Sequence, residues 1–315
     1  MLEILSITGV IFILIGLGFA SVKLGLFSAA DVGTLGKYVV YFALPALIYR
    51  AIGSRQIEEI ANPVYLVSYL AGAVIAFWFG YVWSRRMAGN GPMTSTFWAM
   101  GMACPNSGFV GYPVLLMALP GVASTALALN IVAENVVLIP MVLIMIEYAR
   151  GKSTDRNLAL QILGRLMRNP IVIAFLVGMV GMVLEIELPP VLARPIELIA
   201  GSSAAVSLVS IGGSLALVQV GKLDPALMMI TFGKLILHPL AVAGVLFLFG
   251  LFGFGLADPE LRAAVILSAA MPVMAIYPIL AQQNGEGQTA SVALLMMTVM
   301  AMATLSAALW VLTPT

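Results

Sequence analysis

Long apolar runs alternate with short polar segments along almost the whole chain of 315 residues. A helix needs about 20 apolar residues to cross a bilayer, and the pattern predicts ten spans of roughly this length. The predicted spans are Ile4–Val22, Val32–Ile52, Pro63–Trp83, Met93–Leu119, Ser124–Tyr148, Pro170–Leu184, Leu192–Val218, Pro225–Phe252, Glu260–Gln283 and Thr289–Leu312. The pattern therefore predicts an all-α polytopic membrane protein.

Two of these spans contain prolines that should break the helix at membrane depth. Pro105 and Pro113 interrupt the fourth span, and a proline has no N–H to donate to the carbonyl four residues earlier. Pro272 and Pro278 interrupt the ninth span in the same way. Carbonyls freed in hydrocarbon are tolerated only where protein, water or a ligand satisfies them. We expect each broken helix to direct its inner ends at a small polar site.

The broken spans occupy equivalent places in the two halves of the chain. Tyr112-Pro113-Val114-Leu115 and Tyr277-Pro278-Ile279-Leu280 lie 165 residues apart. Five spans in each half is an odd number, so the halves, residues 1–149 and 169–315, would enter the membrane from opposite sides. Inverted repeats with paired broken helices are typical of secondary transporters.

Composition and charge support this picture and orient it. The chain is 62% hydrophobic and 9% charged, whereas a soluble domain carries about 25% charged residues. Its net charge of +1 gives no nucleic-acid signature. Nine Lys and Arg residues lie in loops that follow odd-numbered spans and four lie in loops on the other side. Basic loops stay in the cytoplasm, so we expect both termini to be extracytoplasmic. The segment 150–168 would be a cytoplasmic amphipathic loop.

The sequence carries no enzyme signature. It has one histidine, one cysteine, no Cys/His cluster, no phosphate-binding Gly-rich loop and no paired carboxylates within one span. We therefore expect no enzymatic activity, no cofactor and no metal site. Pumping would draw on the substrate's own gradient or on a coupling ion, H⁺ or Na⁺.

Asn106 is the first candidate for substrate contact. It lies in the first break beside Pro105, with Ser107 and Gly108 following it. The amide side chain offers two donors and an acceptor at a place where backbone groups are also freed. Local capping of the helix is the alternative role.

Ionisable residues within the spans are the second group of candidates. Asn130 and Glu134 are four residues apart in the fifth span, and Lys234 and His238 are four apart in the eighth. A charge at the bilayer centre costs at least about 2.5–3.5 kcal/mol, so it usually marks a pathway or relay. A structural Glu134–Lys234 ion pair and a purely structural His238 are the alternatives. Lys234 is also a candidate counter-charge for an anion.

The motif at the first break resembles a known family. Cys104-Pro105-Asn106-Ser107-Gly108-Phe109-Val110-Gly111-Tyr112-Pro113 resembles the Pro-Asn…Gly-x-Pro crossover of the auxin efflux carrier family, which includes plant PIN-formed transporters and bacterial organic-acid carriers. The stretch from Met271-Pro272 to Asn284-Gly285 is similar to the family's second crossover. Phe42-Ala43-Leu44-Pro45-Ala46-Leu47 resembles its second-span motif.

The resemblance implies ten helices in two inverted five-helix repeats with crossed broken helices, similar to the sodium–bile acid symporter and sodium–proton antiporter folds. Spans one, two, six and seven would form a scaffold, and spans three to five and eight to ten a transport domain. The resemblance also implies an anionic, carboxylate-bearing substrate. The chain lacks the long hydrophilic central loop of the plant members, which favours a bacterial carrier.

These observations predict a secondary active transporter that moves a small organic anion, auxin-like or malate- or malonate-like, across the plasma membrane by elevator-type alternating access. The residues assigned to substrate binding are Pro105, Asn106, Ser107, Gly108, Lys234, Pro272 and Val273. The residues assigned to coupling or proton relay are Asn130, Glu134 and His238. The expected partners are the substrate, membrane lipid and a second copy in a homodimer. Two alternatives stay open: a cation-coupled or cation/proton antiporter using Glu134, and a membrane sensor that binds a ligand without transporting it.

Overall fold

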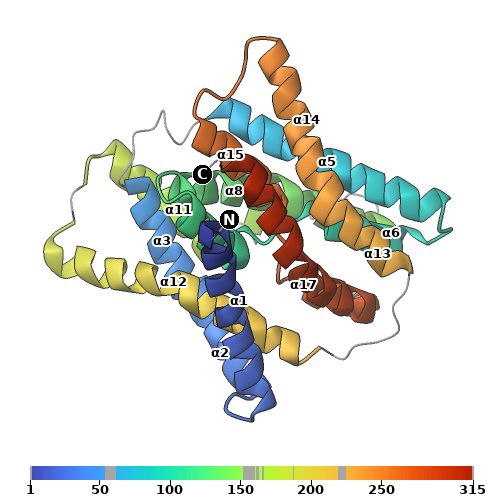
Figure 1. The fold of residues 1–315 in the computed structure, drawn as a ribbon, viewed down its shortest axis with the longest axis horizontal. Coiled ribbons are helices and arrows are strands. Elements are labelled where there is room, and N and C mark those ends of the chain that lie inside the picture. The colour runs from blue at the N-terminus through green and yellow to red at the C-terminus, as the bar shows by residue number, and fades with distance from the viewer. Residues whose placement is uncertain are drawn as a thin grey trace. The chain divides into compact units, whose positions relative to one another are not determined.

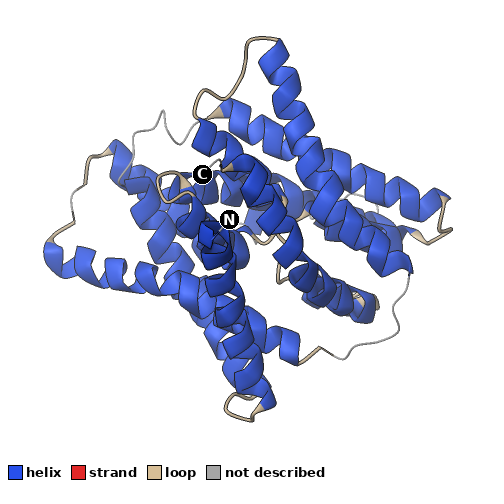
Figure 2. Ribbon diagram, in the orientation of Figure 1, coloured by secondary structure: helices blue, strands red, loops and turns tan. Residues whose placement is uncertain are grey.

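The computed structural model describes residues 2–53, 62–151, 160, 163–164, 167–186, 188–218 and 225–313. All regular elements in these ranges are helices (Figure 2). Six of the helical segments are long and apolar enough to cross a membrane: Ala29–Ile52, Pro63–Arg86, Ala123–Ala149, Pro190–Ala216, Pro225–Leu251 and Gly287–Leu312. Thr8–Lys23, Ser107–Ala118 and Pro170–Val183 are shorter apolar helices. The predicted all-α class is confirmed. The predicted cytoplasmic loop 150–168 falls mostly outside the described residues.

The described chain divides into two compact units. The first unit contains residues 1–62, 107–132 and 166–217, and the second contains 63–106, 133–165 and 218–315. The helices of the first unit are α1 (Leu2–Lys23), α2 (Ala29–Tyr38), η1 (Val39–Ala43), α3 (Leu44–Gly53), η2 (Ser107–Gly111), α7 (Tyr112–Ala118), most of α8 (Ala123–Ala133), α11 (Pro170–Val183) and α12 (Pro190–Ala216).

The second unit holds the N-terminal halves of both broken spans. Its helices are α5 (Pro63–Arg86), α6 (Pro92–Ala103), η3 (Glu134–Leu138), α9 (Ile139–Ala149), α13 (Pro225–Phe232), η4 (Gly233–Leu237), α14 (His238–Leu251), α15 (Pro259–Ala269), α16 (Tyr277–Gln282) and α17 (Gly287–Leu312). The helices begin and end close to the predicted spans, because the length of each apolar run and the flanking proline or polar residues set these limits locally.

The first unit is built around the contact of α1 with α12 (Figure 1). A side chain on Gly212 of α12 would overlap the carbonyl of Ile15 in α1. The two backbones therefore approach as closely as they do only because this position is a glycine, the usual basis of close helix packing in membranes. α11 packs against α3 on another part of the same unit.

The second unit is organised around α5, which contacts α6 and α14 (Figure 1). Gly72 of α5 meets the backbone of Val242 in α14. Fully buried aromatic side chains fill this core: Tyr65, Tyr69, Phe77, Phe97 and Tyr277. The C-terminal helix α17 packs against α13 and α16.

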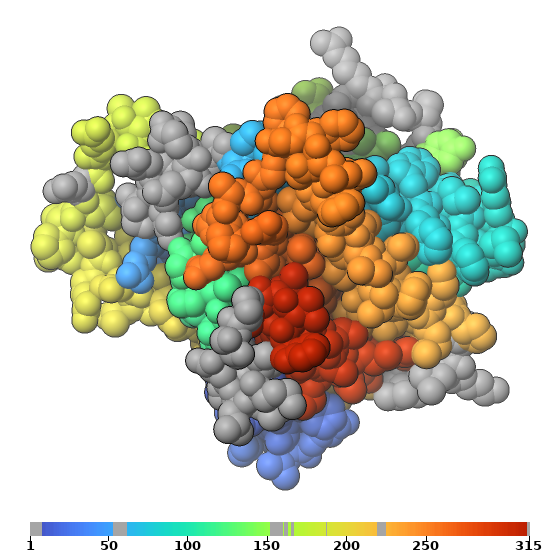
Figure 3. Space-filling model, turned by 45° about the horizontal axis from the view of Figure 1, so that its top comes forward, coloured from blue at the N-terminus to red at the C-terminus, as the bar shows by residue number. Residues whose placement is uncertain are grey.

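Large apolar side chains remain exposed along α14, which lies on the surface in Figure 3 (orange). Leu240, Phe247, Leu248 and Leu251 are each more than half exposed. Soluble monomers rarely expose contiguous apolar surface of this kind. The surface of α14 suits contact with lipid.

Four π-helical turns lie in the described residues, and each ends two residues before a proline. These turns are η1, η2, η3 and η4, and the prolines are Pro45, Pro113, Pro140 and Pro239. A proline removes one hydrogen bond of the helix, and its ring clashes with the carbonyl four residues earlier. The wider turn relieves this conflict and lets the helix continue. Glu134 and Lys234 both lie within such turns.

Candidate functional site

The two broken helices meet in the second unit. α6 ends at Ala103 and α15 ends at Ala269. The extended residues that follow pair in an antiparallel bridge between Pro105 and Val273. The N–H of Asn106 donates to the carbonyl of Pro272 at 2.8 Å, and the N–H of Met274 donates to the carbonyl of Cys104 at 3.0 Å.

This pairing follows from the two prolines. Pro105 and Pro272 cannot supply the N–H that would continue α6 and α15, so the chain leaves the helix at both places. Buried backbone groups must still be hydrogen-bonded, and each break supplies partners for the other. The structure thus brings four predicted residues together, Pro105, Asn106, Pro272 and Val273. Asn106 is buried, with 3% of its surface exposed.

Lys234 lies at the end of α15. Its Nζ donates to the carbonyl of Ala269 at 2.5 Å. Ala269 is the last residue of α15, and the last carbonyls of a helix have no partner within it and carry the negative end of its dipole. A cation is therefore favourable at this place, even though Lys234 is completely buried.

His238 is the second partner of this amine. The Nζ of Lys234 lies 3.1 Å from the Nδ1 of His238, one helical turn further along. The other ring nitrogen, Nε2, is buried and has no hydrogen-bond partner within the described residues. The imidazole ring lies against the ring of Tyr69, with 6.3 Å between the ring centroids.

Tyr69 connects this pair to Glu134. Its Oη donates to the Oε1 of Glu134 at 2.7 Å, and Glu134 is only 4% exposed. A chain of polar side chains thus runs from η3 through α5 and η4 to the end of α15. Tyr69 provides a hydrogen-bond partner for Glu134, and Ala269 and His238 provide partners for Lys234.

Tyr69 and the carbonyl of Ala269 were not among the predicted site residues. A tyrosine inside an apolar span, as in Val67-Ser68-Tyr69, is a signal for Tyr69 because its hydroxyl needs a partner when buried. Nothing in the sequence indicates the carbonyl of Ala269, because every residue has a backbone carbonyl.

Three predicted residues belong to the first unit. Ser107 and Gly108 begin η2, and Asn130 lies in α8 one turn before Glu134. Ser107 and Asn130 are buried. A side chain on Gly108 would crowd Leu44 of α3, which is a packing reason for this glycine. Their roles in binding and coupling stay predictions.

Comparison with known proteins identifies the class of protein. Residues 6–311 match the model of the family described as "Membrane transport protein", and the chain belongs to this family. The resemblance to the auxin efflux carrier family is thereby confirmed, and the chain is a multi-pass protein of a membrane transporter family.

Several curated relatives are similar over most of their length. The chain is 27% identical over 312 residues to the "Putative malonate transporter" of Rhizobium meliloti (strain 1021), covering 98% of this chain and 96% of that protein. It is 26% identical over 239 residues to the "Uncharacterized transporter YfdV" of Escherichia coli (strain K12), covering 74% of each. An "Uncharacterized transporter" of Methanothermobacter thermautotrophicus is 23% identical over 278 residues, covering 87% of this chain and 86% of that protein.

Proposed function

We propose that the chain is a secondary active transporter for a small organic anion in the plasma membrane, and that malonate-like dicarboxylates are its first candidate substrates. The observation that carries the proposal is the pairing of the two broken helices through Asn106 and Pro272, next to the buried amine of Lys234. The similarity to a protein named as a malonate transporter supports the choice of substrate class.

The side chains at the crossover suit a carboxylate. The ammonium group of Lys234 has three N–H donors, and the contacts with Ala269 and His238 use two of them. The amide of Asn106 adds neutral donors. In the proposal, Asn106 hydrogen-bonds the substrate, Lys234 supplies the counter-charge, and the prolines keep the backbone open. Ser107 and Gly108 follow the first break, and Val273 lies in the second.

The proposed architecture has ten helices in two inverted five-helix repeats, with both termini extracytoplasmic. The division of the chain supports a scaffold and a transport domain. The first unit contains the predicted first, second, sixth and seventh spans, together with residues 107–132. The second unit contains the paired breaks. In elevator-type alternating access, the second unit would carry the substrate and the first would stay fixed.

A second candidate function is coupling to H⁺ or Na⁺ through Glu134. The burial of this carboxyl and its bond to Tyr69 favour it, because a buried ionisable group in a membrane protein often belongs to an ion pathway. Asn130 and His238 would extend the relay. The same carboxyl would serve a cation/proton antiporter, which would not move malonate.

Uptake of labelled malonate into liposomes tests the proposal. We expect the wild-type protein to accumulate malonate. In Asn106→Ala the half-saturating malonate concentration should rise by an amount that corresponds to a loss of about 0.5–3 kcal/mol of binding free energy, the range for neutral to charge-assisted hydrogen bonds. Asn135→Ala, which changes a half-buried asparagine of η3, should leave uptake unchanged. Binding of malonate without uptake would favour the sensor, and uptake that is the same in Asn106→Ala and wild type would refute the site.

A further inference from the structure

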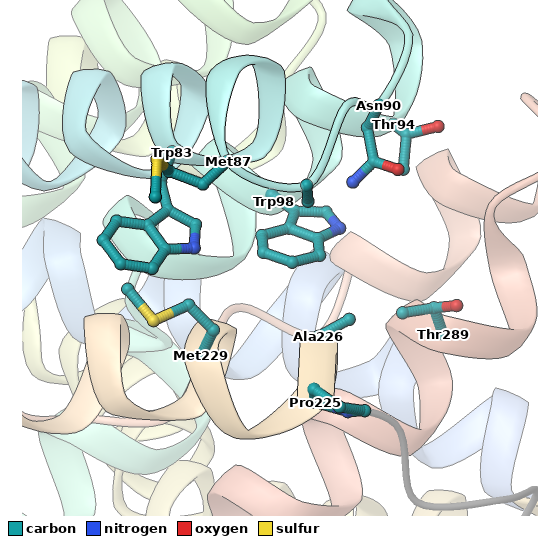
Figure 4. Close-up of a pocket in the computed structure, with 10 residues that line it drawn as sticks. Trp83, Met87, Asn90, Thr94, Trp98, Pro225, Ala226, Met229 and Thr289 are labelled. Atoms are coloured by element: carbon teal, nitrogen blue, oxygen red, sulfur yellow. The ribbon is translucent and has the colours of Figure 1, made fainter.

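Two cavities of the second unit are lined by none of the candidate site residues. The larger has a volume of about 620 Å³ and lies between Trp83, Trp98 and Met229 (Figure 4). None of its described lining residues is charged. The smaller has a volume of about 410 Å³, within the range of about 300–1,000 Å³ typical of ligand pockets. It lies between α14 and α15, and its described lining includes one charged residue, Arg262. We call it the α14–α15 groove.

The α14–α15 groove begins where a membrane span ends. α14 stops at Leu251, the last residue of a segment long and apolar enough to cross a membrane, and α15 begins at Pro259 after a short loop. Along α14 the lining runs from Gly250 back to Ala243, which is about 10 Å at 1.5 Å per residue. The groove therefore extends from the end of the span toward its interior.

The surroundings of the groove are apolar and open. Phe247 and Leu251 line it, and Phe252 and Phe254 follow α14 in the chain. Each of these four side chains is more than 60% exposed. Contiguous exposed apolar surface is rare on soluble monomers, so this surface suits the hydrocarbon of a bilayer. An acyl chain fits such a groove by its chemistry.

Arg262 provides a cation at the outer end of the groove. It lies in the first turn of α15 and is exposed. Its side chain forms no ion pair or hydrogen bond with the part of the chain that the structure describes. A guanidinium group binds phosphate oxygens through a planar fork of N–H donors. A cation at the outer end of an apolar groove matches a phospholipid, which has its phosphate at the membrane surface and its chains inward.

Asp258 adds a negative charge one turn before Arg262. The N–H of Arg262 donates to the carbonyl of Asp258 at 3.1 Å, so the two residues lie on the same face of α15. The Oδ1 of Asp258 accepts from the N–H groups of Glu260 at 2.9 Å and Leu261 at 3.3 Å. These bonds hold the carboxylate at the start of the helix, and it forms no ion pair with Arg262. They also use the first N–H groups of α15, so the helix end itself is already capped.

Glu260 is the third charged residue of this segment. It lies two positions from Asp258 and two from Arg262, and residues two apart do not face each other on a helix. Glu260 does not line the groove. The outer end of the groove therefore presents one cation and one carboxylate on the same face, with about 5–6 Å between Cβ atoms at this spacing.

We propose that the α14–α15 groove binds a membrane phospholipid with a zwitterionic ethanolamine head. The phosphate pairs with Arg262, the primary ammonium donates to the Oδ2 of Asp258, and one acyl chain lies against Phe247. A glycerol head has no cation for Asp258, and a choline head has no N–H to donate. The proposal does not depend on the transport function, because none of these residues belongs to the candidate site.

Quenching by brominated acyl chains tests the proposal, because bromine quenches a tryptophan that it contacts. The reporter variant carries Phe247→Trp, at an exposed position in the groove, and has its four native tryptophans replaced by phenylalanine. The replacement is needed because Trp83 and Trp98 line the other cavity (Figure 4). The matched control keeps Phe247 and one native tryptophan, Trp310, which is 64% exposed on α17.

Both variants are reconstituted in phosphatidylcholine bilayers that contain one brominated probe. The probes are phosphatidylethanolamine, phosphatidylglycerol, which lacks the ammonium, and diacylglycerol, which lacks the phosphate. In the Phe247→Trp reporter, phosphatidylethanolamine should bind about two- to fivefold more strongly than either other probe, the range given by one exposed ion pair. Trp310 should show no such preference.

Two further substitutions in the reporter separate the two contacts. Asp258→Asn removes the charge and keeps the helix cap, because asparagine caps as well as aspartate. It should abolish the preference over phosphatidylglycerol and keep the preference over diacylglycerol. Arg262→Gln should do the reverse. The matched controls are Glu260→Gln, which is outside the groove, and Arg168→Gln, an exposed arginine of the first unit; both should leave the two preferences unchanged.

Three results would overturn the proposal. Equal quenching by phosphatidylethanolamine and diacylglycerol would make the groove a crevice for any acyl chain. Stronger quenching by phosphatidylglycerol would make it a site for an anionic lipid. A preference for phosphatidylethanolamine over phosphatidylglycerol that survives Asp258→Asn would show that the carboxylate does not bind the ammonium.

Native mass spectrometry guards against a misfolded reporter, because it needs no introduced tryptophan. From an equimolar mixture of the three lipids, the wild-type protein should retain phosphatidylethanolamine in excess over the other two. Asp258→Asn should lose the excess over phosphatidylglycerol, and Arg262→Gln the excess over diacylglycerol. The same lipid ratios in the wild type and both variants would count against the site.

Discussion

At the scale of single residues, the most informative feature is a buried polar chain in the second unit. Lys234 and His238 are fully buried, and Glu134 nearly so. Burying such groups is expensive unless they are hydrogen-bonded. The carbonyl end of α15, a tyrosine hydroxyl and an imidazole provide the partners. These contacts hold the residues in place and offset part of the cost of their burial.

The role of Glu134 in coupling can be separated from its role in packing. Glu134→Gln keeps an oxygen that accepts from Tyr69 but removes the ionisable group. If Glu134 carries the coupled ion, this variant should lose gradient-driven accumulation of malonate and retain substrate exchange. Both activities can be measured in the same liposomes, with and without an imposed ion gradient.

Tyr69→Phe is the matched control, because it removes the hydrogen bond and keeps the carboxyl. It should lower the free energy of unfolding by about 1.5–3 kcal/mol, the range for a bond to a charged group. Normal accumulation by Glu134→Gln would show that the carboxyl is structural. In that case Glu134→Gln combined with Lys234→Met should be more stable than Glu134→Gln alone.

At the scale of elements, prolines decide where the helices deviate. Pro113, Pro140 and Pro239 each follow a π-helical turn, and the helix continues past them. Pro105 and Pro272 instead lie in extended segments that pair with each other. The two outcomes differ in the hydrogen bonds that are on offer. A helix can stay broken only where the backbone groups freed by the proline find hydrogen-bond partners on another segment.

Restoring the missing N–H should close the breaks. In Pro105→Ala and Pro272→Ala the helix can extend past its present end, which competes with the bonds from Asn106 to Pro272 and from Met274 to Cys104. We expect malonate uptake to fall in both variants while helical content, measured by circular dichroism, holds or rises. Pro195→Ala is the control, because Pro195 lies inside the continuous helix α12. Unchanged uptake in both break variants would show that the crossover is only a kink.

The close approach of α5 and α14 depends on Gly72. A Cβ there would lie 2.8 Å from the backbone nitrogen of Val242, so Gly72→Val must push the helices apart. Overpacking of this kind costs about 1–3 kcal/mol of stability. Gly244→Val is the control in α14, because nothing lies within 4 Å of its Cβ position. Equal unfolding temperatures for the two variants would show that the helices can separate without cost.

At the scale of the whole molecule, the orientation in the membrane governs which side each surface faces. Basic residues predict that the loop after α1 is cytoplasmic and the loop after α14 extracytoplasmic. In a Cys104→Ala background, an impermeant thiol reagent applied to intact cells should label Ala257→Cys, which follows α14, and spare Leu26→Cys, which follows α1; both residues are exposed. Labelling after permeabilisation controls for reactivity. The reverse pattern would invert the predicted topology and the polarity of transport.

The sequence by itself determined the membrane class, the family, the helix limits and the two breaks. All of these are local: the length of an apolar run, the missing N–H of Pro105 and Pro272, and a short motif around Asn106. Pro140 and Pro239 nevertheless follow π-helical turns that the sequence pattern does not predict. A proline in the sequence marks where a helical hydrogen bond is lost. It does not by itself decide between a wider π-helical turn and a broken helix.

The tertiary structure decided which polar groups meet. Asn106 and Pro272 are 166 positions apart, and Lys234 reaches a backbone carbonyl of another helix. Every residue has a backbone carbonyl, so no sequence pattern could identify Ala269 as the partner of Lys234. Tyr69 as the partner of Glu134 was likewise decided by packing, because a hydrogen bond depends on distances between helices that the order of residues does not specify.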